Sequence, residues 1–239
     1  MVSRGCCGPL SELDVSVGLW AVLVVVGAAL GLDAASWPQV MISRPIVAAT
    51  IGGALLGDAS SGFLVGAILE LLGLGHTPYG AAVYPETGPA SLVAGAGLAA
   101  SGDSGLGPLL LAVACGWIIG WVGAATVRLQ RRINGYLVAS LAAAAPYRLE
   151  RRHRMAMTID ALRAGALTAA FAVPVMILVK LVSRLPTGGA ALPVASAVLL
   201  VAVALAGGVG VRVMGGRRTA PLLFGAGGAA AALLILLTG

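Results

Sequence analysis

Long apolar runs separated by short polar stretches dominate the hydrophobic pattern of this chain. The first run covers 15–32, and later runs cover 105–127, 162–183, 190–211 and 220–237. Each is close to the roughly 20 residues that a helix needs to cross the hydrocarbon core of a bilayer. Because backbone polar groups in lipid must be satisfied within the segment, such runs predict helices. The pattern predicts an all-α, polytopic membrane protein that forms one integral membrane domain over 1–239.

The segment 44–104 is also apolar, but glycine, proline or a carboxylate interrupts it every few residues. Its apolar pieces, about 46–57, 62–75 and 89–100, are each too short to span a bilayer. Short, Gly/Pro-interrupted segments are typical of the binding region of a transporter. We therefore expect a broken, re-entrant helical element here that forms the substrate region.

Glycines recur within this segment at a spacing that suits close helix packing. Gly53 and Gly57 are four residues apart, as are Gly62 and Gly66. Such pairs let two backbones approach closely. Taken alone, however, the glycines are explained more simply by ordinary packing between two unbroken helices.

Composition and charge narrow the class of protein. Residues of the set AVILMFWYC make up 59% of the chain, and only 10% are charged, against about a quarter in soluble globular proteins. This excludes an ordinary soluble domain and a disordered chain. Eight arginines lie between 128 and 163. Because these charges lie between apolar runs, we interpret them as a sign of membrane topology and not of nucleic-acid binding. The positive-inside rule then predicts that the cationic segment 128–161 lies in the cytoplasm. Counting the later runs forward places the C-terminus outside.

Three of the nine acidic residues lie inside the broken segment: Asp58, Glu70 and Glu86. A charge at membrane depth costs at least about 2.5–3.5 kcal/mol on insertion scales, so each needs a compensating role. Carboxylate oxygens could accept hydrogen bonds from the hydroxyls of a neutral sugar, hold a cation or carry a proton. Asp58 could equally cap the following helix. Glu70 could instead pair with Arg44 and hold the broken segments together.

No motif for a cofactor, a metal or covalent catalysis is evident in the sequence. His76 and His153 are the only histidines, and neither completes a convincing catalytic set. The three cysteines show no metal-binding spacing or disulfide framework, and no glycine-rich phosphate loop is present. His76 lies between Glu70 and Glu86 in the sequence and is a candidate for lining the same cavity, although a position at the membrane interface explains it as well.

The segment also carries an ordered set of short motifs. In chain order they are Arg44-Pro45, Gly53 with Gly57-Asp58, Leu69-Glu70-Leu71, Gly80 to Ala82, and Pro85-Glu86. With these motifs, residues 40–100 resemble the IIC membrane component of the mannose/fructose/sorbose class of the bacterial phosphotransferase system. The rest of the chain is similar to that family in its hydropathy profile.

The resemblance implies a bacterial inner-membrane permease subunit for a hexose-type sugar. It implies a partner IID membrane chain, soluble IIA and IIB proteins that relay phosphate from phosphoenolpyruvate to the sugar, and an oligomeric assembly. The IIC chain itself is expected to perform no covalent chemistry. Glu70 and Glu86 then fall in the sugar-binding region, with Asp58 at the turn between re-entrant segments.

Two other functions remain open from the residues themselves. A cation-coupled secondary carrier could use Glu70 as its coupling carboxylate, but such carriers usually contain inverted repeats, and no second copy of the 44–104 pattern is found in 105–239. A divergent orphan or regulatory membrane protein could retain the same scaffold without transport.

Overall fold

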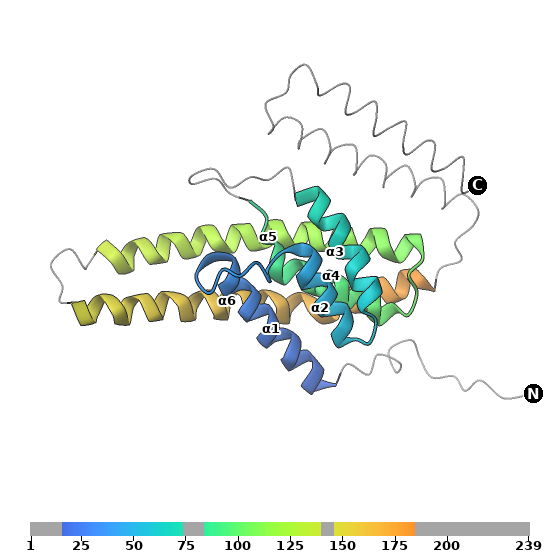
Figure 1. Cartoon of the computed structure of the whole chain (residues 1–239), viewed down its shortest axis with the longest axis horizontal. Helices are drawn as coiled ribbons and strands as arrows, with labels where there is room; N and C mark the ends of the chain where they lie inside the picture. Colours follow the sequence, from blue (N-terminus) through green and yellow to red (C-terminus); the bar gives the residue numbers. More distant parts are fainter. Residues whose placement is uncertain (1–15, 74–83, 140–145, 185–239) are drawn as a thin grey trace, which may run out of the picture.

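Helices form the regular structure throughout the described part of the chain. The computed structural model describes residues 16–73, 84–139 and 146–184. The helices are α1 (Val17–Ala35), α2 (Pro45–Leu55), α3 (Ala59–Gly73), α4 (Thr87–Ser101), α5 (Leu106–Ala139) and α6 (Pro146–Ser183). In Figure 1, α5 and α6 run side by side along the longest axis, and α1 to α4 gather against part of their length. The predicted all-α membrane fold is confirmed.

Helix α4 forms the centre of the bundle. It contacts each of the other five described helices, and its residues from Gly88 to Ala99 are all buried. Its glycines and alanines let neighbouring backbones come close. A Cβ atom built on Gly95 would lie 2.2 Å from the carbonyl oxygen of Ala49, and one on Gly52 would lie 2.2 Å from that of Leu92. Helices α2 and α4 therefore touch backbone to backbone, which is how small residues drive helix association in membranes.

The predicted broken element corresponds to α2, α3 and α4. Helix α2 has 11 residues and α3 and α4 have 15 each, so at 1.5 Å per residue they are about 17–23 Å long, shorter than the ~30 Å hydrocarbon core. Pro45 occupies the first turn of α2, a position where its missing N–H costs nothing. Gly57, with φ +88°, turns the chain between α2 and α3 in a conformation that other residues rarely adopt.

Helices α5 and α6 extend further than the apolar pattern predicts. The apolar runs end near 127 and begin near 162, yet α5 has 34 residues and α6 has 38. Most of the cationic segment 128–161 is therefore helical rather than a separate segment, because arginine, leucine and glutamine are good helix formers even where the chain leaves an apolar environment. In Figure 1 these ends project beyond α1 to α4.

Three described helices are long and apolar enough to cross a membrane: those containing Val17–Ala35, Leu106–Tyr136 and Leu149–Ser183. They correspond to the predicted runs 15–32, 105–127 and 162–183. The predicted runs 190–211 and 220–237 lie outside the described residues.

The packing brings several charged groups to one end of the bundle. At this end Arg163 on α6 binds Glu86, which precedes α4. Asp160, also on α6, accepts hydrogen bonds from Arg163 and from Ser36, which follows α1. Arg128 and Arg131 of α5 lie beside them, around one cavity. We call this the arginine-rich end. Asp103, which follows α4, lies one α4 length away at the opposite end of the bundle.

The arginine-rich end should face the cytoplasm. We expect a reporter fused after residue 140 to give a cytoplasmic signal, and one fused after Asp103 to give an external signal, because the apolar half of α5 separates them. Alkaline phosphatase and green fluorescent protein fusions report the two sides. Signals from the same side at both positions would contradict this orientation.

Candidate functional site

Arg163 of α6 lies at the centre of a buried network of charged and polar side chains. Its guanidinium binds both carboxylate oxygens of Glu86, with Nη2 2.7 Å from Oε1 and Nη1 bonded to Oε2. Nη2 also donates to Oδ1 of Asp160 at 2.8 Å. From α5, Oε1 of Gln130 accepts from Nε at 2.6 Å and Oγ1 of Thr126 accepts from Nη1 at 3.0 Å. The planar guanidinium suits such a bidentate carboxylate pair.

The network extends to α1 and to the backbone of α5. The hydroxyl of Ser36, just after α1, donates to Oδ2 of Asp160 at 2.8 Å. The N–H of Glu86 donates to the carbonyl of Gly120 at 2.9 Å. Gly123 leaves room for the Glu86 side chain, since a Cβ built there would lie 2.7 Å from Oε2. Groups from α1, α4, α5 and α6 thus meet around one cation.

Burial makes this pairing necessary. The side chains of Glu86, Asp160 and Arg163 are 4%, 2% and 10% exposed. An isolated charge at such a position would be strongly unfavourable, and only paired, fully hydrogen-bonded charges are tolerated. Because one cation binds two carboxylates, the three groups together carry a formal charge of −1.

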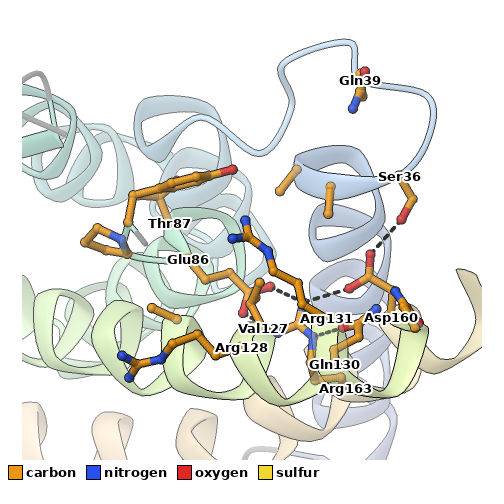
Figure 2. A pocket seen from close by; sticks show the side chains of 16 residues that line it. Ser36, Gln39, Glu86, Thr87, Val127, Arg128, Gln130, Arg131, Asp160 and Arg163 are labelled. Atoms are coloured by element: carbon orange, nitrogen blue, oxygen red, sulfur yellow. Dashed lines mark hydrogen bonds and ion pairs between the residues drawn. The ribbon is translucent and has the colours of Figure 1, made fainter. Parts of the chain in front are cut away.

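A cavity of about 350 Å³ opens beside this network (Figure 2). It lies between the end of α1, the start of α4, the middle of α5 and α6, and its volume falls in the ~300–1,000 Å³ range of small-molecule sites. Its polar lining is formed mainly by Ser36, Gln39, Tyr84, Glu86, Thr87, Arg128, Gln130, Arg131, Asn134, Asp160 and Arg163. Hydroxyl, amide, carboxylate and guanidinium groups therefore converge on one space.

The structure places one of the four predicted binding residues, Glu86, in this cavity. Glu70 instead forms an ion pair with Arg44, whose Nε lies 3.2 Å from its Oε1. Its Oε2 lies 3.4 Å from the backbone N–H of Ile46. Glu70 on α3 thus holds the start of α2, which is the alternative arrangement that the sequence left open.

Asp58 precedes α3 and caps its first turn. It accepts hydrogen bonds from the N–H of Ser61 at 3.0 Å and from the hydroxyls of Ser60 and Ser61. These hydrogen bonds lower the pKa of Asp58 to about 2, so the carboxylate stays ionised near neutral pH. This matches the capping role that was one of its two predicted roles. His76 lies outside the described residues.

Sequence reasoning did not identify Asp160 and Arg163 as site residues. Their signal was present: both lie where the apolar run of α6 begins, three residues apart, so they share one helix face. Asp33 was also missed. It is buried within α1 and accepts from the N–H groups of Val40 and Ser43 at 2.7 and 2.9 Å, fixing the loop that borders the cavity. Within the described ranges, no group of three His, Cys, Asp or Glu residues could hold a metal ion.

Replacing Glu70 separates its two predicted roles. In the pair seen here, Glu70→Gln leaves Arg44 without its counter-ion, so the chain should lose stability. The loss should be small, up to about 1 kcal/mol, because the two side chains are 20% and 58% exposed. Thermal unfolding in detergent measures it, and Glu70→Gln/Arg44→Gln should recover part of the loss. A fall in sugar affinity of about 10- to 150-fold with unchanged unfolding would instead identify Glu70 as a ligand.

Comparisons with known proteins agree with the resemblance. Residues 15–215 match the family described as PTS system sorbose-specific IIC component. The mannose-specific EIIC component of the PTS system of Escherichia coli is 35% identical over 75 residues, 31% of this chain and 28% of that protein. The fructose permease IIC component of Bacillus subtilis is 35% identical over 89 residues, 37% of this chain and 33% of that protein. The matched stretches thus span a third or less of these relatives.

A solved structure described as "Structure of membrane protein" shares the fold. Its TM-score is 0.71 at 19% sequence identity, and the match covers 94% of each chain. Identity at that level establishes the fold alone. The family match, in contrast, covers most of the 239 residues. The chain is therefore a member of the sorbose-type IIC family of phosphotransferase-system membrane components.

Proposed function

We propose that this chain is the sugar-binding and translocating subunit of a phosphoenolpyruvate-dependent phosphotransferase system of the mannose/fructose/sorbose class. The observation that carries the proposal is the polar cavity built around Glu86 and Arg163 inside an otherwise apolar helical bundle. In a chain of this family, a cavity of that kind has the chemistry to bind a hydroxyl-rich substrate.

Hydroxyl groups can both donate and accept hydrogen bonds, and the cavity offers both kinds of partner. Glu86 supplies carboxylate oxygens that each bind Arg163, and a carboxylate oxygen can accept more than one hydrogen bond. Gln130, Asn134 and Ser36 add amide and hydroxyl groups on the other walls. Of the four residues predicted from the sequence, we propose Glu86 as the direct sugar contact. The sugar-binding roles of Asp58, Glu70 and His76 stay predictions.

The proposed work of the chain is binding and conformational exchange rather than covalent chemistry. Phosphate transfer is assigned to separate IIA and IIB proteins, and a IID membrane chain is proposed to complete the translocation path in an oligomeric complex. The arginine-rich end, where the cavity opens, is the end at which a cytoplasmic phosphate carrier could reach a bound sugar.

Partner dependence tests this proposal. The purified chain alone should show no sugar kinase activity with any phosphoryl donor. Cells should accumulate phosphorylated mannose, fructose or sorbose only when the chain is co-expressed with IID-, IIA- and IIB-type proteins, because the phosphate must come from them. Separation of free and phosphorylated radiolabelled sugar measures the kinase activity of the purified chain and the accumulation of phosphorylated sugar in cells.

Glu86→Gln and Glu150→Gln form a matched pair for this assay, since Glu150 lies on the exposed surface of α6. Uptake per folded complex should fall with the first variant and persist with the second. Robust uptake of unmodified sugar by this chain alone in proteoliposomes would contradict the proposal and favour a cation-coupled carrier.

A further inference from the structure

Two arginines at the mouth of the cavity are not used by the buried network. Arg128 and Arg131 line the cavity from α5 and are exposed. Neither has an ion pair or side-chain hydrogen bond to another described residue. Glu86 and Asp160 both bind Arg163, and these three groups together carry a formal charge of −1, which can offset only one of the two arginines. The cavity is lined by three arginines (Arg128, Arg131 and Arg163) and two carboxylates (Glu86 and Asp160), so its formal charge is +1. The arginines without an ion pair to a described residue lie at its mouth.

The start of α4 adds further positive potential to the same space. Thr87 opens α4 and lines the cavity, and the preceding Glu86 makes no side-chain cap hydrogen bond. The first N–H groups of a helix have no partner within the helix, and the macrodipole makes that end positive. In α4 these groups belong to Thr87 and Gly88, since the third residue, Pro89, has no N–H. In Figure 2, Arg131 reaches from α5 toward this start of α4, whereas Arg128 extends in another direction. The side chain of Arg131 and the start of α4 thus lie at the same region of the cavity.

Asn134, which lines the same cavity, carries an unpartnered acceptor. The side-chain oxygen Oδ1 of Asn134 is buried and has no hydrogen-bond partner among the described residues. A buried polar atom of this kind is unfavourable unless a partner binds it. Asn134 lies three residues after Arg131, on the same face of α5. A ligand that presents both an anion and a hydroxyl would satisfy both positions.

We propose that this cavity binds a phosphate monoester, with the phosphate between Arg131 and the start of α4 and a hydroxyl of the ester on Asn134. A phosphate monoester carries a charge of about −1.5 to −2 near neutral pH and three acceptor oxygens, which match a guanidinium and free N–H groups. If the proposed function holds, this ligand is the phosphorylated sugar, held at the cytoplasmic end before release. The other source of the same chemistry is the phosphate of phosphatidic acid in the surrounding lipid.

Binding of charged and uncharged sugars distinguishes the proposal from a general polar cavity. Isothermal titration of the full chain, assembled with its membrane partner in nanodiscs of phosphatidylcholine, would compare mannose 6-phosphate, mannose and inorganic phosphate. We expect mannose 6-phosphate to bind at least about tenfold more tightly than mannose, and its affinity to fall as salt increases. Arg131→Gln should reduce the preference for the phosphorylated sugar by about 10- to 100-fold. Arg132→Gln, an exposed neighbour that does not line the cavity, should preserve it.

Nanodiscs that contain phosphatidic acid separate the two sources. If the lipid occupies the site, it should compete with mannose 6-phosphate in the wild type and not in Arg131→Gln, which would assign the site to lipid and overturn the product assignment. Equal preference in the wild type and Arg131→Gln, or equal binding of mannose and mannose 6-phosphate, would overturn the phosphate site itself. Normal sugar uptake by a complex that fails these tests would leave the proposed function intact. Absent uptake by the wild-type complex would contradict the proposed function separately.

Discussion

The arrangement of this protein depends on placing one buried arginine among two carboxylates. Arg163 is 10% exposed, and its guanidinium is bound by Glu86, Asp160, Gln130 and Thr126. A buried charge is tolerated only when its partners are held in place. The partners come from α4, α5 and α6, and Ser36 links α1 through Asp160. The requirement to satisfy this cation therefore fixes how four helices meet at the arginine-rich end.

Close packing of small residues makes that meeting possible. Helix α4 is too short to span the bilayer but is buried along most of its length, so its polar start can lie inside the bundle rather than at a lipid surface. Backbone contacts at Gly95 and Gly52 hold α2 against it. The start of α4 then borders a polar cavity instead of lipid, and the exposed Arg128 and Arg131 of α5 line the same cavity. Binding chemistry and helix packing are thus two consequences of the same geometry.

The sequence predicted the positions of the helices better than the contacts between residues that lie far apart in the chain. Run length and the Gly/Pro interruptions identified the three spanning helices of the described residues and the broken element, because both depend on local composition. The cationic ends of α5 and α6 were not predicted as helix, since a hydropathy boundary marks where lipid ends rather than where a helix ends. Glu86 was predicted as a site residue from its position in the broken segment. Its partner Arg163 lies 77 residues away, and only the packing of α4 against α6 brings the two together.

A double-mutant cycle on Glu86 and Arg163 tests most directly whether this pair holds the bundle together. The free energy of unfolding would be measured for the wild type, Glu86→Gln, Arg163→Gln and the double variant, with Glu150 and Arg154 as an exposed control pair on α6. Arg163→Gln should cost about 3–5 kcal/mol, because it leaves two buried carboxylates without a counter-ion. Glu86→Gln should cost less, because Asp160 still pairs with Arg163. We predict a coupling energy of at least about 2 kcal/mol there, against about 0–1 kcal/mol for the control. Additive effects at Glu86 and Arg163, with coupling no larger than in the control, would contradict the account.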